Sequence, residues 1–302
     1  MHGVNRSLQI TCMVIARITS GLGNQLFQYA VARHLALRNR TDLYVDLSYY
    51  RQTYATDTPR AFRLHHFNTD YRVLNHSPYS YVSKATKLLP RRTLKPLAQF
   101  VREGQFHFDD NVLNASARLI TLEGFWQSER YFADCADVIR RELAFKHPLG
   151  DTAAAYERAI DEAAVPVSVH IRRGDYVHHP EFSQTFGFVG LDYYRAALAY
   201  LTAQFPTLIL FIFSDDPQWV REHLAPAGSH VYVQNTGEVA DLDDLYLMSR
   251  CRHHVIANSS YSWWGAWLDP RPDKVVIAPR TWFRNKPDSN TKDLIPAAWL
   301  RL

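Results

Sequence analysis

The chain has 302 residues, which is enough for two domains of about 150 residues each, and 47% of them are hydrophobic and 21% charged, as in globular proteins. The net charge of +4 is mild for this length, so it permits an anionic ligand without indicating a nucleic-acid-binding protein. The three cysteines, Cys12, Cys135 and Cys251, are widely spaced and odd in number, which argues against a disulfide framework or a zinc site and fits a reducing compartment.

The residues near the N-terminus do not read as a membrane span. Residues 8–18 are apolar only in parts, and Gln9, Thr11 and Arg17 interrupt them. The stretch is too short to cross a bilayer or to serve as the apolar part of a signal peptide. We therefore expect a cytoplasmic protein.

Short β-branched and apolar runs alternate with longer amphipathic stretches along the chain. This alternation predicts α/β domains with parallel strands and right-handed crossovers. The expected strands are residues 13–18, 43–47, 118–122, 165–171, 208–213, 230–233, 254–257 and 275–278, and the expected helices are 24–37, 130–143, 191–204, 217–224, 241–250 and 261–268. A turn with Pro148 and Gly150 leads into an Ala-rich helix, so we place a domain boundary between residues 1–150 and 151–302. Two doubly wound halves that face each other across a cleft, with ligands at the carboxyl ends of the strands, are the expected architecture.

The segment 68–108 breaks the alternation and is rich in Tyr, Lys, Arg and Pro, so we expect irregular helices there. Its part from residue 84 to residue 102 holds six basic residues and no acid: Lys84, Lys87, Arg91, Arg92, Lys95 and Arg102. A solvated helical face is the favoured interpretation. The alternative is a patch that contacts anionic lipid headgroups and holds the protein peripherally on the inner face of a membrane.

The first motif, TSGLGNQLF at residues 19–27, follows a strand and opens a helix. Gly21 and Gly23 allow a tight turn and a close ligand, the helix N-terminus offers free N–H groups, and Asn24 would project its amide into the cleft. The alternative is the dinucleotide fingerprint G-x-G-x-x-G. It is disfavoured because Leu26 replaces the third glycine and only Asp46 offers an acid for a ribose.

The second motif, residues 166–176, is an apolar strand that ends in polar residues. Strand alternation puts His170 and Arg172 on one face, where the guanidinium is suited to a diphosphate. Asp175, after a glycine turn, would hold an arginine or act on the substrate. The alternative is a cluster of surface ion pairs.

The third motif is Ser214-Asp215-Asp216-Pro217, again at the end of a strand. Pro217 suits the first position of a helix, with Asp216 as its N-cap, so Asp215 would point into the cleft. An acidic pair also suggests a metal site. We disfavour a metal because no third carboxylate is near in the sequence and an arginine can neutralise a diphosphate.

The fourth motif covers residues 243–268, a helix, a strand and a second helix. Asn258, Ser259 and Ser260 are N-cap types at a turn that can cradle phosphate. The tryptophans at helical spacing, Trp263, Trp264 and Trp267, are expected in the core. We expect His253 and His254 to be ordinary strand-edge residues that point to opposite faces, so they cannot share a metal.

Together these segments resemble the α-1,2-fucosyltransferases of bacterial type, and they occur in the order of that family. The matching segments are GLGNQLFQYA at residues 21–30, HIRRGDYV at 170–177, FSDD at 213–216, DLYLMS at 244–249 and ANSSYSWWGAWL at 257–268, with a weaker match of GFWQSERYF at 124–132. The least similar part is the segment 68–108.

The resemblance implies a GT-B fold of two Rossmann-like domains, an N-terminal acceptor-side domain and a C-terminal domain that binds GDP-fucose. It implies metal-independent, inverting transfer of fucose to the 2-hydroxyl of a galactose-terminated glycan, as in O-antigen synthesis. Arg172 would contact the β-phosphate, His170 the nucleotide and Asp244 the guanine edge. The other donor-site residues expected are Gly23, Asn24, Arg173, Asp215, Asn258, Ser259, Ser260, Tyr261 and Ser262.

For catalysis we expect Arg172 to stabilise the charge that grows on the leaving phosphate. Asp175 is the first choice as the base, ahead of Asp46, Glu129, Glu181 and Asp192, and Asn24 would orient the acceptor or the fucose. The competing functions are an NAD-dependent oxidoreductase built on the first motif and a non-catalytic GDP-sugar-binding protein. Another GDP-sugar donor or another linkage is also open.

Overall fold

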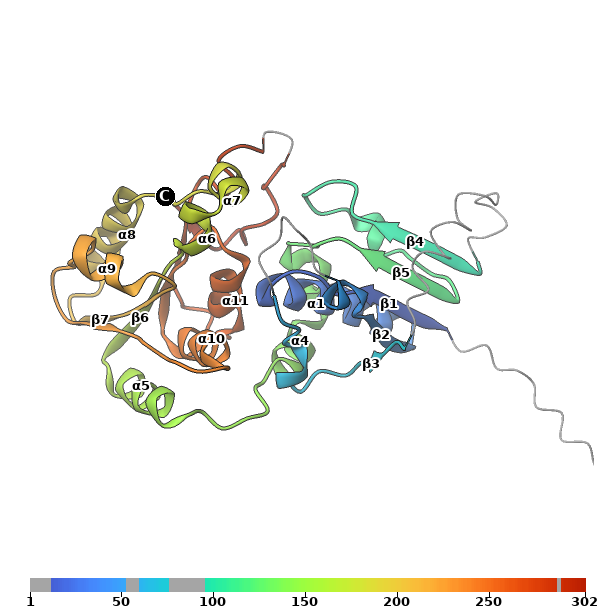
Figure 1. The fold of residues 1–302 in the computed structure, drawn as a ribbon, viewed down its shortest axis with the longest axis horizontal. Coiled ribbons are helices and arrows are strands. Elements are labelled where there is room, and N and C mark those ends of the chain that lie inside the picture. Colours follow the sequence, from blue (N-terminus) through green and yellow to red (C-terminus); the bar gives the residue numbers. More distant parts are fainter. Residues whose placement is uncertain (1–11, 53–59, 76–95, 287–288) are drawn as a thin grey trace, which may run out of the picture. The chain divides into compact units, whose positions relative to one another are not determined.

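The computed structural model describes residues 12–52, 60–75, 96–286 and 289–302 (Figure 1). The chain divides into two compact units, one ending at Leu143 and the other beginning at Ala144. The boundary predicted from the sequence lies a few residues later. Five of the six residues of the basic segment, Lys84 to Lys95, lie outside the described residues, while Arg102 pairs with Glu123 at 2.7 Å.

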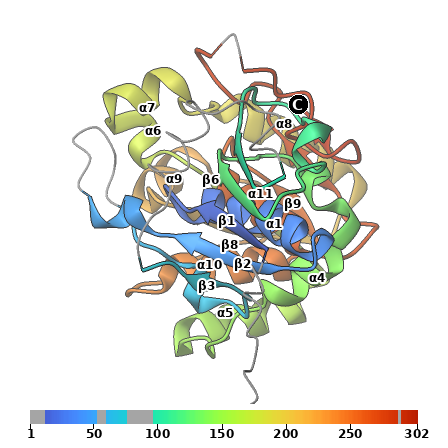
Figure 2. The ribbon, with the colours of Figure 1, turned by 90° about the vertical axis from the view of Figure 1, so that its right-hand side faces the viewer.

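The N-terminal unit is built on a parallel sheet with the strand order β3-β2-β1-β5-β4. The long helix α1 packs against β1 and β2 and buries most of its residues, because it follows β1 directly and crosses back over the sheet (Figure 2). The strands are β1 Met13–Arg17, β2 Asp42–Asp46, β3 Arg72–Val73, β4 Ala98–Arg102 and β5 Leu119–Glu123, and the helices are α1 Leu22–Arg38 and α4 Ala136–Glu142. The described residues of this unit also form five short 3-10 helices: Ser48–Arg51, Leu64–His66, Asp110–Val112, Glu129–Tyr131 and Ala133–Cys135.

Residues 76–95 of the segment 68–108, where we expect irregular helices, lie outside the described residues. The described remainder of the segment contains the strands β3 and β4, and β4 forms because it pairs with β5 along its full length. One sequence prediction for this unit was wrong. The helix expected at residues 130–143 is broken into two 3-10 turns and α4. The carbonyl of Tyr131 lies 2.6 Å from Nδ1 of His34, and Phe132 is buried with a non-helical backbone (φ -142°, ψ 16°), so tertiary contacts compete with the continuous helix.

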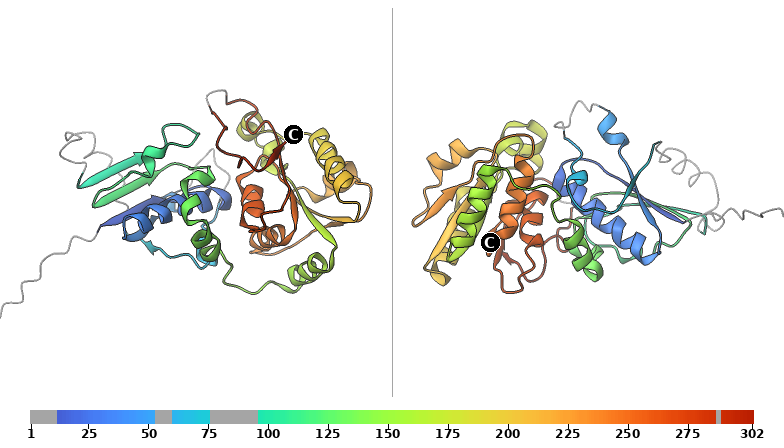
Figure 3. Two further views of the ribbon diagram at one scale, coloured as in Figure 1. Left: turned by 180° about the vertical axis from the view of Figure 1, so that it is seen from behind. Right: turned by 90° about the horizontal axis from the view of Figure 1, so that it is seen from below.

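The C-terminal unit is built on a second parallel sheet, with the order β11-β10-β9-β6-β7-β8. Helices α8 and α9 cover one face and α10 and α11 the other (Figures 1 and 3). The strands are β6 Val165–Ile171, β7 Leu208–Ser214, β8 His230–Tyr232, β9 His253–Val255, β10 Val276–Ala278 and β11 Leu300–Arg301. The helices are α5 Asp151–Glu162, α6 Gly174–His178, α7 Pro180–Thr185, α8 Leu191–Gln204, α9 Pro217–His223, α10 Ala240–Arg250 and α11 Ser260–Leu268.

The central strands of this sheet are buried and mostly apolar, because both of their faces are covered. Val169 of β6 and Ile212 of β7 pack with Tyr194 of α8 in one core. On the other side, the predicted packing role of the tryptophans of α11 is confirmed, since Trp263 and Trp264 are fully buried and Trp267 nearly so.

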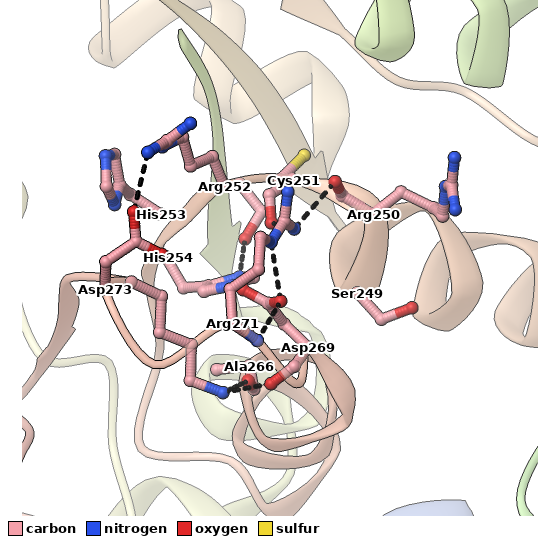
Figure 4. Close-up of polar contacts among 12 residues, drawn as sticks. Ser249, Arg250, Cys251, Arg252, His253, His254, Ala266, Asp269, Arg271 and Asp273 are labelled. Carbon is pink, nitrogen blue, oxygen red and sulfur yellow. Dashed lines mark hydrogen bonds and ion pairs between the residues drawn. The ribbon is translucent and has the colours of Figure 1, made fainter. Parts of the chain in front are cut away.

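A buried polar network ties β9 to the end of α11 (Figure 4). His254 lies 2.8 Å from the hydroxyl of Ser168 on β6 and 3.1 Å from Asp269, which also accepts from Arg271 at 2.7 Å. All three of Ser168, His254 and Asp269 are buried, so this serine–histidine–aspartate row joins the strands and is closed to substrates. The prediction that His253 and His254 are strand-edge residues was wrong, because β9 lies in the interior of the sheet.

Candidate active site

The carboxyl ends of β6 and β7 bring the second and third motifs together. The two strands pair in parallel with Ile171 opposite Ser214, so the residues that follow them, Arg172 and Asp215, leave the sheet side by side. This register explains how two segments more than forty residues apart form one cluster.

Arg172 is the centre of this cluster. Its Nη2 lies 2.6 Å from Asp175 and its Nη1 lies 3.0 Å from Asp215, while its guanidinium carbon lies 5.5 Å from the ring centre of Tyr176. Burial alone would lower the pKa of Arg172, but the charges of Asp215 and Asp175 outweigh burial and raise it. The arginine is therefore a fixed, permanently charged group, the kind of donor that recognises phosphate oxygens.

Asp175 lies in the first turn of α6, a short helix where the sequence predicts a glycine turn. Its carboxylate accepts the charge-assisted bond from Arg172, so the first of its two expected roles, holding an arginine, is present in the structure. The ion-pair cluster weighed as the alternative is also present, in a partly buried form.

Arg173 turns to a different set of partners. Its guanidinium carbon lies 3.5 Å from the ring centre of Trp219 on α9, and its Nε lies 3.0 Å from Asp216. Only its backbone N–H takes part in the cluster around Arg172, by donating to Asp215 at 2.8 Å. The side chain of Arg173 thus fastens α9 to the end of β6, and its predicted contact with the donor stays a prediction.

Asp216 is the N-cap of α9, as predicted. Its carboxylate accepts the backbone N–H of Trp219, and Pro217 takes the first turn of the helix. Asp216 is in turn held by Ser214, whose hydroxyl accepts its N–H at 3.0 Å.

His170 is the last buried polar residue of β6. Burial first, and the charge of Arg172 second, lower its pKa to about 3, so the imidazole is neutral at physiological pH. Its Nδ1 has no hydrogen-bond partner among the described residues, and its ring lies 5.4 Å from that of Tyr261. A neutral ring with one free nitrogen can donate to or accept from a ligand without adding charge.

Asp244 is a carboxylate of the fourth motif and lies on α10. Burial raises its pKa to about 7, although a hydrogen bond from Nδ2 of Asn235 at 2.8 Å works in the other direction. Burial first, and then the charge of Asp244, raise the pKa of Tyr261 on α11, while the charge of Arg172 works in the other direction. The Tyr261 hydroxyl donates to the carbonyl of Asp241 at 2.5 Å. Asn235 lies outside every motif singled out from the sequence, and only its hydrogen bond reveals it.

The turn from β9 into α11 carries the remaining polar residues. Ser259 is the N-cap by position, but its side chain makes no cap hydrogen bond, so the first N–H groups of α11 keep their donor capacity. Ser262 is buried and its hydroxyl donates to the carbonyls of Ala257 and Ser259. Asn258 is buried with its amide nitrogen bonded to carbonyls of two loops, whereas Ser260, the first residue of the helix, is half-buried.

Gly23 and Asn24 belong to the N-terminal unit, at the start of α1. The oxygen of Asn24 accepts from Gln127 at 2.7 Å and its nitrogen donates to Ser20 at 3.1 Å. Buried Gln25 likewise binds the backbone at residues 20, 61 and 63. The amides of the first motif therefore join the loops at the carboxyl ends of the N-terminal strands, and their predicted role with the substrate stays open.

The family comparison decides what kind of protein carries this cluster. The model of glycosyl transferase family 11 matches residues 13–301, nearly all of the chain. The chain belongs to this family. It is a glycosyltransferase, and the resemblance drawn from its motifs is confirmed.

Two of the relatives of this glycosyltransferase span nearly its full length. An O-antigen biosynthesis glycosyltransferase, WbnK of Escherichia coli, is 31% identical over 94% of this chain and 99% of its own. An α-1,2-colitosyltransferase, also of Escherichia coli, is 32% identical over 96% of this chain and 99% of its own. A galactoside 2-α-L-fucosyltransferase of Caenorhabditis elegans is 28% identical over 53% of this chain and 45% of its own.

Solved structures confirm the predicted fold class. The fucosyltransferase NodZ from Bradyrhizobium superposes with a TM-score of 0.51 at 16% identity, covering 86% of this chain and 94% of its own. A variant of Arabidopsis thaliana FUT1 in complex with GDP has a TM-score of 0.50 at 13% identity, covering 95% of this chain and 75% of its own. The fold of the family 11 chain is α/β GT-B, with two parallel sheets.

Within residues 12–52, 60–75, 96–286 and 289–302, no group of three or more His, Cys, Asp or Glu side chains is arranged to hold a metal ion. In the same residues no helix is long and apolar enough to cross a membrane. Independence of metal ions and peripheral membrane contact both stay predictions.

Proposed function

We propose that this glycosyltransferase moves L-fucose from GDP-fucose to the 2-hydroxyl of a galactose-terminated glycan, with inversion and without a metal ion. The single observation that carries the proposal is the half-buried Arg172, held by Asp175 and Asp215 at the end of β6 beside neutral His170. The proposal is supported by family membership and by the names of relatives that act as α-1,2-transferases.

In this proposal Arg172 does the electrostatic work of the reaction. As the glycosidic bond breaks, negative charge grows on the β-phosphate of the leaving GDP. A guanidinium already fixed by two carboxylates stabilises that charge without reorganising, and the N–H groups at the start of α11 can add to it. The other proposed donor contacts are His170 with the nucleotide and Asp244 with the guanine edge, whose N–H groups suit a carboxylate acceptor.

Asp175 remains the first proposal for the base that accepts the proton of the acceptor hydroxyl. Because its carboxylate also binds Arg172 at 2.6 Å, the two roles must be separated by experiment. If Asp175 is the base, Asp175→Asn lowers kcat and removes the acidic limb of its pH profile while GDP still binds. If it only holds Arg172, the same change weakens GDP binding and leaves the shape of the profile unchanged.

One relative of 32% identity is named a colitosyltransferase. We therefore propose fucose as the first donor sugar to test and colitose as the second. The proposed setting is O-antigen or other surface-glycan synthesis, in line with the name of the relative WbnK.

The experiment mixes the purified chain with GDP-fucose and lactose in the presence of EDTA and follows GDP release and product mass. A parallel reaction contains GDP-colitose in place of GDP-fucose. A fucosylated product supports donor, reaction and metal independence together, and methylation analysis then tests the linkage. Product from GDP-colitose alone would mean that colitose, and not fucose, is the donor sugar. GDP binding without transfer to any acceptor would favour the non-catalytic alternative. Absence of GDP binding would overturn the proposal.

A further inference from the structure

Asn258 lies just after strand β9 of the C-terminal sheet, and its side chain is buried, with 1% of the residue exposed. Its Nδ2 lies 3.3 Å and 3.2 Å from the carbonyls of Phe186 and Gly187, and 3.1 Å from the carbonyl of Trp282. An amide nitrogen has two hydrogens, so these three carbonyls share its full donor capacity. In this arrangement Asn258 has no donor left for a phosphate, and it fastens two loops to the sheet.

The backbone of Asn258 adds a third connection. Its carbonyl accepts the hydroxyl of Tyr176 at 3.2 Å. The ring of Tyr176 stacks on that of Phe186, with centres 5.0 Å apart and planes 9° apart. Because the carbonyl of Phe186 also accepts from Nδ2 of Asn258, the residues Asn258, Tyr176 and Phe186 form a closed circuit of contacts. This circuit holds α6 against the end of the strand.

The loop on the far side of this circuit is fixed independently. Gly187 has φ +64°, in the left-handed region that favours glycine, and a side chain there would overlap the guanidinium of Arg284. The backbone N–H of Arg284 donates to the carbonyl of Thr185 at 2.8 Å. The circuit is therefore bonded, through the residues just before Gly187, to the backbone of Arg284.

Tyr176 connects the circuit to the anion-binding arginine. The guanidinium carbon of Arg172 lies 5.5 Å from the centre of its ring, and the neighbouring residue Asp175 binds the same guanidinium at 2.6 Å. Both contacts with Arg172 come from α6, a helix of five residues that cannot hold its place by length alone.

We propose that Asn258 is a positioning residue that acts through Tyr176 to hold α6, so that Asp175 and Tyr176 keep Arg172 aimed at the β-phosphate of the donor nucleotide. The inference rests on the proposed donor site. It assigns Asn258 a role different from the direct phosphate contact that the resemblance implies, and it gives Tyr176 a function that no motif suggested.

The test compares the affinities of the full chain for GDP and GMP, measured by isothermal titration calorimetry. GMP lacks the β-phosphate, so the ratio of the two dissociation constants reports the grip of Arg172 and is insensitive to a general loss of stability. Tyr176→Phe removes only the hydroxyl, and Asn258→Ala removes the amide. Tyr232→Phe is the matched control, because Tyr232 also donates its hydroxyl to a backbone carbonyl, that of Leu224 at 2.9 Å, and also has an arginine, Arg221, over its ring.

We expect the wild type to prefer GDP and both site variants to lose about threefold to tenfold of that preference, as for the loss of one or two hydrogen bonds. The control keeps the wild-type ratio. In an Arg172→Ala background, Tyr176→Phe changes the ratio no further, because its effect passes through Arg172.

Two results from the variants would overturn the inference. Equal weakening of GDP and GMP would mean that the circuit is merely structural. Loss of preference in Asn258→Ala but not in Tyr176→Phe would mean that Asn258 contacts the phosphate itself. If Asn258→Ala does not fold, Tyr176→Phe with its control decides alone. A wild type that binds GDP and GMP equally well would instead reject the proposed donor site, and this inference with it.

Discussion

The Oδ2 of Asp215 lies 3.0 Å from Nη1 of Arg172, and this contact occupies the space beside residue 174. A Cβ on Gly174 would overlap that same carboxylate oxygen. The glycine is therefore required by the close approach of Asp215 and not by its backbone angles, since its φ is not in the left-handed region.

Gly174→Ala should displace Asp215 and loosen Arg172. We expect GDP to bind about tenfold more weakly, because an uncompensated guanidinium loses both its fixed direction and a charge-assisted bond. Gly150→Ala is the control, since a Cβ there meets no atom within 4 Å. Titration calorimetry with GDP gives both values, and wild-type affinity in Gly174→Ala would contradict the geometry.

Arg172→Ala should lower kcat by about 10² to 10³, the usual effect of removing a preorganised donor to a developing charge. Arg172→Lys should recover little of the rate, because an ammonium cannot bind Asp175, Asp215 and a phosphate with one planar fork. The measurement is the initial rate of GDP release with GDP-fucose and lactose. Near-normal turnover in the alanine variant would reject the assignment.

GDP binding should weaken as the pH falls below 7. The pKa of Asp244 is raised to about 7, mainly by burial, so the free protein increasingly carries the neutral acid below that pH, and a neutral acid is a poorer acceptor for two N–H groups of guanine. We expect affinity to fall between pH 7.5 and pH 6 in the wild type and to be low and nearly independent of pH in Asp244→Asn. A wild-type affinity that is constant over this range would show that the carboxylate of Asp244 does not bind the base.

Acid should destabilise the C-terminal unit through His254. Burial lowers its folded-state pKa to about 4 from an ordinary 6.5, so the neutral ring contributes stability that is fully present above pH 6.5 and is lost as the pH falls toward 4. The shift corresponds to a contribution on the order of 3 kcal/mol. His254→Gln should be less stable at pH 7.5, but its free energy of unfolding should fall less steeply between pH 6.5 and pH 4.

Urea unfolding at a series of pH values checks this slope. His223→Gln is a suitable control, because it removes an exposed histidine of α9 from the same unit. A His254→Gln variant with the full wild-type slope would exclude His254 as the source of the acid sensitivity. Buried His170, whose pKa is lowered to about 3, would then be the next histidine to replace.

Much of the fold could be predicted because it depends on local patterns of the sequence. The strand Val165–Ile171 and the helix Leu191–Gln204 were predicted with the bounds that the structure has, since a run of buried apolar residues and a 3.6-residue period survive in any tertiary context. The N-cap of α9 at Asp216 is equally local. The edge strand β4 was missed because its residues are half-buried at most and form a strand only by pairing with β5.

The sequence by itself determined which polar groups end the strands of this protein and, through the order of its motifs, its family. It could not determine which of these groups remain available to a ligand, because a side chain's partners come from distant segments. The side chain of Arg173 contacts Trp219 and Asp216, and the amide of Asn258 donates to the carbonyls of residues 186, 187 and 282. Arg172, in contrast, is held in place by the carboxylates of Asp175 and Asp215. Tertiary packing decided which of these side chains bind other residues and which stay available to a ligand, because each buried polar group must pair with a donor or acceptor that the fold brings within reach.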